Sequence, residues 1–481
     1  MLLNSTSCYQ ALKARDVRFD GRFFVGVSST QIYCRPVCTV KTPKAQNCSF
    51  FPSAAAAEAL GYRPCLRCRP ELAPGNASVD ARGRLAQSAA GMIEDGSLNE
   101  AGIDYITQRL GVTDRHLRRV FKSEFGVSPV EYAQTHRLLL AKRLLTDTAL
   151  PITHVAMASG FGSLRRFNTL FRTRYRLSPT DLRKHVQNGA TADVLNFALS
   201  YRTPFDWNAL LAFLRKRAIA GVEYVEDQRY SRTVRIAHNG QEHHGWLSVV
   251  PARRKAAVEV SLSVSLVRAI PAVLARVKRL FDLACDPAQI ETALGSLATA
   301  HPGLRLPGAF DGFEIAVRAI VGQQVTVKAA RTLAGRFAAA FGTQIVTPVP
   351  GLANLFPTAA AIAQLEPPAI AQLGIIRSRA SAIIVIARAV SDCTLQLEPG
   401  GDIESTLDRM RGLPGIGEWT TQYIAMRALS WPDAFPHTDY GVLKAMGDHN
   451  PQRALERAAQ WQPWRAYAVM HLWSSLEGAQ L

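Results

Sequence analysis

The sequence of 481 residues contains no run of 18 apolar residues, so it predicts no membrane span of ordinary length. Its first residues, Met1 to Asn4, have no charged segment and no long apolar segment, and we therefore expect no secretory signal and a cytoplasmic protein. Acidic residues are also scarce, because 38 Asp and Glu stand against 56 Lys and Arg. The imbalance is greatest in residues 1–190, with 27 basic and 14 acidic residues, which favours a polyanionic partner.

Cysteines are few as well. There are eight, and four of them fall into two closely spaced pairs, which is typical of metal ligands in a reducing compartment and not of a disulfide framework. The length allows three or four domains, each large enough for its own core.

The stretch from residue 411 to residue 444 combines a glycine turn with a later aspartate. Residues 413–417 read Leu-Pro-Gly-Ile-Gly and predict a tight turn between two helical patterns, because glycine allows positive φ and close backbone approach. The N–H groups that open the next helix lack intrahelical partners and attract a phosphate. Asp439 follows Gly417 by 22 residues. Taken separately, a connecting turn and a helix N-cap aspartate are the simpler interpretations.

Taken together, these residues resemble the helix-hairpin-helix DNA glycosylases, and especially the 3-methyladenine glycosylase II branch, over residues 195–481. The resemblance implies that Asp439 is the catalytic carboxylate. It also implies that the hairpin grips one DNA phosphate through Leu413, Gly415 and Gly417. Lyase-type relatives have a lysine two residues after the second hairpin glycine, where this chain has Trp419, which cannot form a Schiff base. We therefore expect a monofunctional hydrolase that uses water.

This chemistry requires a base extruded from the duplex and a pocket that favours a cationic alkylated purine. Aromatic faces stabilise a cation by about 0.5–2 kcal/mol each. Trp419 and Tyr423 are four residues apart and share one helix face beside the hairpin. Although each aromatic alone could be an ordinary core residue, we expect the base pocket to contain Trp419, Tyr423, Tyr440, Trp473 and Phe205.

Residues 316–325 resemble the helix and turn that carry the residue inserted into the duplex in this family. Gln324 stands at the matching position, where an apolar residue is familiar, and an amide fills a vacated stack less well. Gln324 or a neighbour is therefore the wedge candidate. Upstream, apolar alternation around Asn239-Gly240 and through residues 258–264 predicts a small antiparallel sheet, with residues 210–217 as a helix packed on it.

The two cysteine pairs read C-x3-C and C-x2-C, with 26 residues between them. Four thiolates at this spacing predict one tetrahedral zinc site formed by Cys34, Cys38, Cys65 and Cys68. From spacing alone, a purely structural zinc site is the simpler interpretation. The surrounding residues resemble the N-terminal domain of the Ada adaptive-response protein over about seventy residues, which implies that Cys34 irreversibly accepts a methyl group from a methylphosphotriester in DNA. Arg35 and Arg67 beside the cysteines are candidate phosphate contacts.

Residues 83–186 predict a double helix-turn-helix. Thr113 caps one predicted helix, and Ser163 caps a second, in which Leu164, Phe167 and Phe171 are expected to face inward. The outward faces are basic, and the whole segment resembles the AraC-type DNA-binding domain. The expected DNA-reading residues are Arg115, Arg118, Arg119, Arg165, Arg166 and Asn168.

The sequence therefore predicts a multidomain, mainly α-helical protein. The expected domains are a small α+β zinc domain (1–75), a double helix-turn-helix domain (83–186), a small antiparallel α+β domain (195–308) and a helical glycosylase domain (309–481). We expect a monomer that excises alkylated purines, accepts methyl groups at Cys34 and binds promoter DNA, with RNA polymerase as a candidate partner. A regulator with an inactive glycosylase half, or with a purely structural zinc site, is the alternative.

Overall fold

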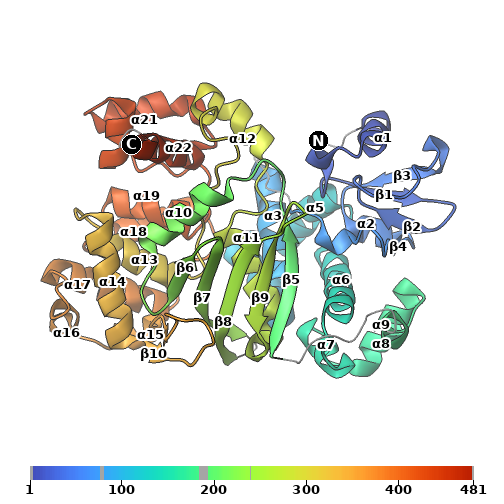
Figure 1. Ribbon diagram of the computed structural model, residues 1–481, viewed down its shortest axis with the longest axis horizontal. Coiled ribbons are helices and arrows are strands. Elements are labelled where there is room, and N and C mark those ends of the chain that lie inside the picture. The colour runs from blue at the N-terminus through green and yellow to red at the C-terminus, as the bar shows by residue number, and fades with distance from the viewer. Residues whose placement is uncertain (1–3, 76–80, 184–192, 239, 479–481) are drawn as a thin grey trace.

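The computed structural model of the protein describes residues 4–75, 81–183, 193–238 and 240–478. Figure 1 shows the N-terminal module and the teal helices on one side of a central sheet, and the yellow to red helices on the other side. The architecture is multidomain and mainly helical, as predicted. Within the described residues, none of the helices combines the length and the apolar character needed to cross a membrane.

The N-terminal module is a four-stranded sheet with strand order β3-β1-β2-β4. Strands β2 and β4 run parallel, and Tyr33 lies opposite Pro64, so this register brings Cys34 and Cys65 to adjacent strand ends. Helix α2 packs against the sheet. The bounds are α1 Ser5–Ala14, β1 Phe24–Val27, β2 Ile32–Cys34, β3 Cys48–Phe51, α2 Ala54–Ala59 and β4 Arg63–Pro64.

Seven helices follow, and two of them begin at the predicted caps. The Thr113 side chain accepts a hydrogen bond from the His116 N–H, and the Ser163 side chain accepts one from the Arg166 N–H. Leu164 was expected inward, but it is 40% exposed because it occupies the first position of α8, outside the apolar stripe. The bounds are α3 Ala81–Glu94, α4 Ser97–Leu110, α5 Asp114–Phe125, α6 Pro129–Asp147, α7 Ile152–Ala158, α8 Leu164–Tyr175 and α9 Pro179–Arg183.

A buried carboxyl group joins the N-terminal module to these helices. Glu58 Oε1 accepts hydrogen bonds from the hydroxyls of Tyr33 (3.1 Å) and Tyr175 (3.3 Å), and Oε2 accepts one from Thr135 Oγ1 (3.1 Å). Burial raises the pKa of Glu58 to about 7, although the three hydroxyls and the nearby charge of Arg174 act to lower it.

This pKa predicts a pH-dependent stability. Because the folded-state pKa lies above the ordinary 4.5, the stabilisation from the neutral carboxyl is full below pH 4.5 and is lost as pH rises through about 7. Relative to Glu58→Gln, the wild type should therefore lose about 3 kcal/mol across this interval. Urea unfolding of both variants at pH 5 and pH 8, with zinc content measured in each, checks this. An unfolding free-energy difference that does not change with pH would contradict it.

The central sheet has five antiparallel strands in the order β5-β9-β8-β7-β6, as the alternation predicted. The turn residue Asn239 lies outside the described residues. The predicted helix is present as α10, which begins earlier than expected because the Asp206 side chain caps it. The bounds are β5 Val194–Ser200, α10 Trp207–Arg217, β6 Glu223–Glu226, β7 Arg229–His238, β8 Gln241–Pro251, β9 Ala257–Ser263 and α11 Ile270–Leu280.

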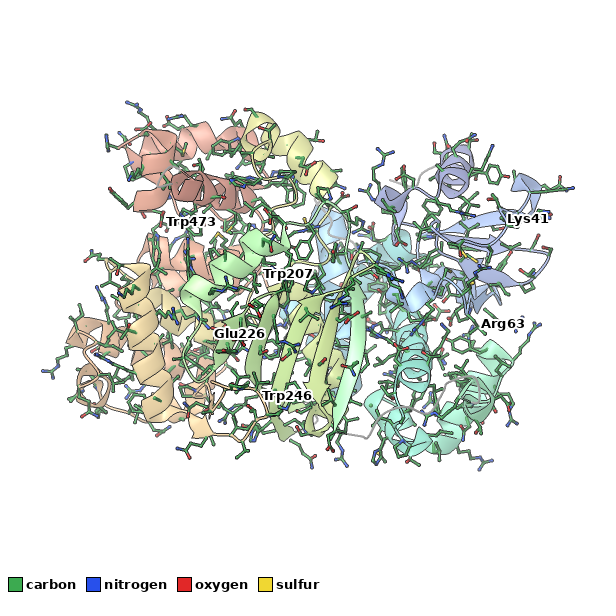
Figure 2. The ribbon with its side chains drawn as sticks, in the orientation of Figure 1. Lys41, Arg63, Trp207, Glu226, Trp246 and Trp473 are labelled. Carbon is green, nitrogen blue, oxygen red and sulfur yellow. The ribbon has the colours of Figure 1, made fainter. Side chains whose placement is uncertain are left out.

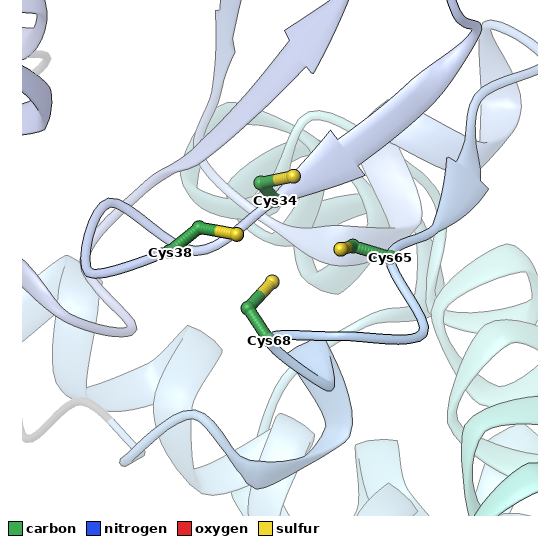
Figure 3. Close-up of side chains that lie close together, drawn as sticks. All are labelled: Cys34, Cys38, Cys65 and Cys68. Atoms are coloured by element: carbon green, nitrogen blue, oxygen red, sulfur yellow. The ribbon is translucent and has the colours of Figure 1, made fainter. Parts of the chain in front are cut away.

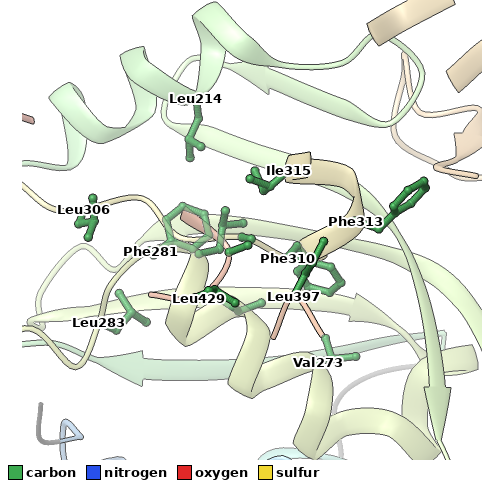
Figure 4. Close-up of a cluster of buried hydrophobic side chains, with 14 of the residues drawn as sticks. Leu214, Val273, Phe281, Leu283, Leu306, Phe310, Phe313, Ile315, Leu397 and Leu429 are labelled. Carbon is green, nitrogen blue, oxygen red and sulfur yellow. The ribbon is translucent and has the colours of Figure 1, made fainter. Parts of the chain in front are cut away.

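The C-terminal helices share one apolar core with the central sheet. Their bounds are α12 Pro287–Leu294, α13 Gly312–Val321, α14 Val327–Phe341, α15 Ala359–Ala363, α16 Pro367–Ala371, α17 Arg377–Ser391, α18 Ile403–Arg411, α19 Glu418–Arg427, α20 Tyr440–Met446, α21 Pro451–Ala458 and α22 Arg465–Gly478, with two short strands, β10 Thr343–Gln344 and β11 Asn354–Leu355, between α14 and α15. Figure 4 shows part of the core, where α10, α11, α13 and the connecting segments contribute Leu214, Val273, Phe281, Leu283, Leu306, Phe310, Phe313, Ile315, Leu397 and Leu429. This shared core fixes the relative positions of the helices that surround the candidate site.

Candidate active site and metal centre

A cavity of about 1250 Å³ opens between α10, α13, α14, α19, α20 and α22. Its lining includes Asp439, Gly417 and the aromatic rings of Trp419, Tyr423 and Trp473. Residues that are more than 200 positions apart in the sequence therefore meet in one cleft, which is large enough for a nucleotide.

The Asp439 carboxylate is held by three N–H donors. Oδ1 accepts hydrogen bonds from the Val442 backbone (2.9 Å) and from Trp473 Nε1 (2.9 Å), and Oδ2 accepts one from Trp419 Nε1 (2.8 Å). Asp439 is therefore the N-cap of α20, and it is also a fixed carboxylate at the cavity wall. Donors on three different elements fix its orientation before any substrate enters.

The aromatic rings form a cluster beside this carboxylate. The rings of Trp419 and Tyr423 lie 5.2 Å apart at an interplanar angle of 17°, and Trp473 lies 6.5 Å from Tyr423. Trp473 points from α22 toward α10, where it stacks on Phe213 with ring centroids 6.3 Å apart (Figure 2). Tyr440 also lines the cavity, but it is 78% exposed and lies at the mouth.

Two arginines lie beside the aromatic side chains at this wall. The guanidinium of Arg217 is 3.7 Å from the Phe213 ring centroid, and that of Arg427 is 4.9 Å from it. Arg427 also donates to the Tyr423 hydroxyl (2.9 Å). Burial acts to raise the pKa of Tyr423, but Arg427, Arg217 and Arg318 outweigh burial and lower it. Arg217 and Arg427 also line the cavity, so its wall combines guanidinium groups with aromatic rings.

The expected hairpin lies between α18 and α19. Gly415 has φ +83°, and a Cβ there would lie 2.7 Å from Ala382 Cβ, so this position requires glycine. A Cβ on Gly417, the N-cap of α19, would meet nothing within 4 Å, so its backbone is open to a ligand. Leu413 is half-buried just before the turn. Gln323 Nε2 donates to the Gly415 carbonyl (3.1 Å) and joins this hairpin to the loop after α13.

That loop carries the wedge candidate. Gln324 is exposed on the cavity rim with a left-handed φ of +52°. Two apolar side chains flank the same rim: Val327 begins α14, and Ile376, 56% exposed, caps α17. The sequence indicated Gln324 or a neighbour, and the structure adds Ile376, which is distant in sequence from that loop.

Phe205 does not line the cavity. Its ring packs 4.4 Å from the ring of Tyr201, and the Arg305 guanidinium lies 5.0 Å from its centroid, so these contacts hold it in the segment before α10. The expectation that Phe205 belongs to the pocket is corrected. Phe213, two turns into α10, is the aromatic that contacts Trp473 instead. In the sequence, its i,i+4 spacing to Arg217 indicated that the two side chains share one helix face.

Four cysteine sulfurs gather in the N-terminal module. The Sγ atoms of Cys34, Cys38, Cys65 and Cys68 all lie within 4.8 Å of one another (Figure 3). Three of these side chains are buried, Cys68 is half-buried, and its Sγ accepts a hydrogen bond from the Arg35 N–H (3.4 Å). Four convergent thiols are the donor set that a tetrahedral Zn²⁺ site requires, and their chemistry fits this ion.

The two arginines beside the cysteines, Arg35 and Arg67, differ in exposure and in their partners. The Arg35 side chain is largely buried and paired with Asp20, which satisfies its guanidinium within the module, so the expectation of a phosphate contact there is corrected. Arg67 is exposed and available to a phosphate.

The expected DNA-reading residues lie on two exposed helix faces. On α5, Arg115, Arg118 and Arg119 are exposed, and Arg118 pairs with Asp114. On α8, Arg165 and Arg166 are exposed, and Asn168 is half-buried.

The whole chain has a close counterpart. It is 36% identical to the "Probable bifunctional transcriptional activator/DNA repair enzyme AlkA" of Mycobacterium tuberculosis, in a match that covers 98% of this chain and 96% of that protein. The chain belongs to this family. Four domain families match it in succession: the metal binding domain of Ada (7–71), a helix-turn-helix domain (106–185), the AlkA N-terminal domain (196–311) and the HhH-GPD superfamily base excision DNA repair protein (317–470).

The C-terminal part has relatives of its own. DNA-3-methyladenine glycosylase 2 of Escherichia coli is 36% identical, in a match that covers 58% of this chain and 96% of that protein. The solved 3-methyladenine DNA-glycosylase from Archaeoglobus fulgidus covers 58% of this chain and 97% of its own length, with a TM-score of 0.50 and 20% identity, which is a likeness of fold.

The indole contact of Trp473 gives a testable prediction. Trp473→Phe keeps a ring against Phe213 but removes the N–H that donates to Asp439 Oδ1. Since a hydrogen bond to a charged group contributes about 1.5–3 kcal/mol, base release should fall at least about tenfold. The rate is measured on N-methylated duplex DNA, with Trp246→Phe on β8 as the control outside the cavity. An unchanged rate would show that this indole does not support the reaction.

Proposed function

We propose that the chain is a monofunctional DNA glycosylase for purines alkylated at N3 or N7, joined to a methyl-accepting zinc domain and a transcriptional regulator. The observation that carries the enzymatic part is the Asp439 carboxylate, held by the indoles of Trp419 and Trp473 at the wall of a nucleotide-sized cavity. Without that carboxylate in a cleft, the alternative of an inactive glycosylase half would be favoured.

Alkylation makes the purine cationic and a better leaving group. When the C1′–N bond breaks, the bonding electrons leave with the base, which becomes neutral, and positive charge develops on the deoxyribose. The Asp439 carboxylate stabilises that charge through space and accepts a hydrogen bond from the water that adds to C1′. The aromatic rings of Trp419, Tyr423 and Trp473 hold the cationic base beforehand.

Hydrolysis by water, without a covalent enzyme intermediate, follows from Trp419. Its Nε1–H is engaged with Asp439, and an indole nitrogen is not a nucleophile. The product is an abasic site on an unbroken strand.

The hairpin and the rim are proposed to bind the DNA around the extruded nucleotide. The open backbone at Gly417 and the first N–H groups of α19 form the phosphate site, with Gly415 and Leu413 shaping the turn. Gln324 enters the vacated stack, and the exposed Ile376 across the rim supplies apolar contact that the amide lacks.

Cys34 is proposed to be the methyl acceptor of the zinc domain. Cys34, Cys38, Cys65 and Cys68 would hold Zn²⁺ as thiolates, and four thiolates would bring more negative charge than the ion neutralises. The Cys34 sulfur attacks the methyl carbon of a methylphosphotriester, the C–O bond breaks, and the phosphodiester leaves with the electron pair. The lost negative charge weakens the repulsion of DNA, so methylation raises affinity, and Arg67 is available to contact a phosphate.

The helix-turn-helix residues on α5 and α8 are proposed to bind promoter DNA. We further propose the domains 1–75, 83–186, 195–308 and 309–481, a monomeric state, a cytoplasmic location suited to reduced zinc-binding cysteines, and contact with RNA polymerase at the promoter. Sedimentation of the purified chain alone tests the monomeric state, and sedimentation with RNA polymerase tests the contact with that enzyme.

The experiment for the enzymatic proposal is chromatography of the bases released from DNA treated with a methylating agent. Free 3-methyladenine and 7-methylguanine, appearing in proportion to enzyme, support it. Absence of free base from DNA that the chain binds would instead favour a damage-binding regulator.

A further inference from the structure

The short helix α2 of the zinc module contacts the last turns of both candidate DNA-reading helices. At its start, the buried Ser53 donates through Oγ to the carbonyl of Phe125, the last residue of α5 (2.6 Å). At its end, the Glu58 carboxyl accepts from the hydroxyl of Tyr175, the last residue of α8, and Arg174 donates to the Glu58 carbonyl (2.9 Å). Two helices that lie about fifty residues apart in the chain therefore end on the same support.

The middle of α2 packs against α5. Ala55, Ala56 and Ala57 belong to the same apolar cluster as Phe121 and Phe125 of α5. A Cβ added to Gly126, just after α5, would lie 3.2 Å from Ala56 Cβ. The first helix-turn-helix therefore packs on α2 through apolar contact.

Glu58 joins this support to two further elements. Its Oε2 accepts from Thr135 on α6, the helix that connects the two helix-turn-helix units, and its Oε1 accepts from Tyr33 on β2. Tyr33 immediately precedes the metal ligand Cys34, and Cys65 follows β4 shortly after α2. Binding of the metal therefore fixes the two strand ends on which α2 rests.

Fixed separation matters for the binding of two recognition helices. Two such helices read successive major-groove segments about one turn of DNA apart, and they bind together only if their spacing matches that repeat. A support that holds both raises the effective concentration of the second helix once the first is bound. Burial disfavours the charged form of Glu58 and raises its pKa to about 7, while its hydrogen bonds to Tyr33, Thr135 and Tyr175 hold three elements against α2.

We propose that Glu58 is a positioning residue that holds the end of α8 against α2, and thereby at a fixed separation from α5, so that sequence-specific DNA binding requires a folded zinc module. This inference rests on the proposed regulatory function and adds to it a physical link between the two N-terminal domains. The contacts of α2 with α5, α6 and α8 are its basis.

The test compares full-length wild type, Glu58→Ala, Glu58→Gln and, as a control outside the helix-turn-helix units, Glu456→Ala at an exposed position of α21. The probe is a duplex enriched by the wild type from a random-sequence pool, with a scrambled duplex for non-specific binding. Glutamine keeps an acceptor for both tyrosines and a donor toward Thr135 Oγ1, so Glu58→Gln should bind like the wild type. Glu58→Ala should lose affinity for the enriched duplex at least about tenfold, with unchanged binding to the scrambled duplex and unchanged base release.

Hydrogen exchange supplies a second measurement that needs no DNA. Amides at the end of α8, including Tyr175 and Arg176, should exchange faster in Glu58→Ala and not in Glu58→Gln. Tyr175→Phe loses one hydrogen bond to Glu58, so its amides at the end of α8 should exchange faster than in the wild type but slower than in Glu58→Ala. This variant replaces Glu58→Ala in the test if the alanine variant loses zinc. Affinity for the enriched duplex within twofold of wild type in Glu58→Ala, or unchanged exchange there, overturns the proposal. If the wild type enriches no duplex, the regulatory function fails, and exchange alone decides whether Glu58 positions α8.

Discussion

Replacement of Asp439 by asparagine is expected to reduce base release by at least about 10²–10³-fold, because the charge that stabilises the developing sugar cation is removed. Asparagine is a good N-cap, so α20 should still begin at this residue and the domain should stay folded. Duplex binding should persist, since the hairpin at Gly415 and Gly417 is not altered. The rate is measured in single-turnover assays on N-methylated duplex DNA.

The control for this change is Asp392→Asn, which neutralises an exposed carboxylate at the end of α17. Its rate should equal that of the wild type. The asparagine amide at position 439 will also face the Trp419 N–H, so circular dichroism and Tm are compared between the variants to separate local repacking from lost chemistry. Near wild-type release of 3-methyladenine by Asp439→Asn would remove this carboxylate from the mechanism.

Replacement of Cys34 by serine is expected to abolish methyl transfer completely. A hydroxyl at this position is a far weaker nucleophile than a thiolate and a poorer zinc ligand. After incubation with methylated duplex, the wild-type peptide that contains Cys34 should be heavier by the mass of one methylene group, and the variant peptide should not. Base release should be equal in both proteins, because the aromatic cavity belongs to the other half of the chain.

Peptides with Cys38, Cys65 and Cys68 provide the internal control for this experiment, since all four sulfurs lie together and only one is expected to react. Removal of zinc by a chelator should stop transfer to Cys34 while leaving base release unchanged. Methylation distributed over several cysteines, or an unmodified Cys34 in the wild type, would favour a purely structural metal site.

Much of the fold follows from local signals in the sequence. Thr113 and Ser163 mark helix starts because their side chains satisfy free backbone N–H groups. Alternation predicts strands of the central sheet because apolar residues recur on one face, as the burial pattern of β5 shows. Leu164 was misassigned because at the first position of a helix an apolar residue can remain outside the stripe. The contact of α2 with both α5 and α8 could not be predicted, since it depends on tertiary packing of residues distant in sequence.

The candidate active site also combines features that the sequence predicts with features that only the tertiary structure shows. The residues Asp439, Trp419 and Tyr423 lie within twenty-one positions, and the helical spacing of the two aromatics indicated a shared face. Nothing local could have indicated that both indoles donate to the carboxylate, because Trp473 comes from the last helix. Phe205 was chosen from its neighbouring residues, whereas the direction of α10 decides that Phe213 contacts the cavity aromatics.

The most direct test of the account is a structure of the chain bound to a duplex that contains an abasic-site analogue. The account predicts that the extruded sugar enters the cavity of Asp439 and that C1′ lies about 3–4 Å from its carboxylate, the distance required of groups that interact in the reaction. A sugar bound elsewhere, with its C1′ out of reach of the Asp439 carboxylate, would contradict it.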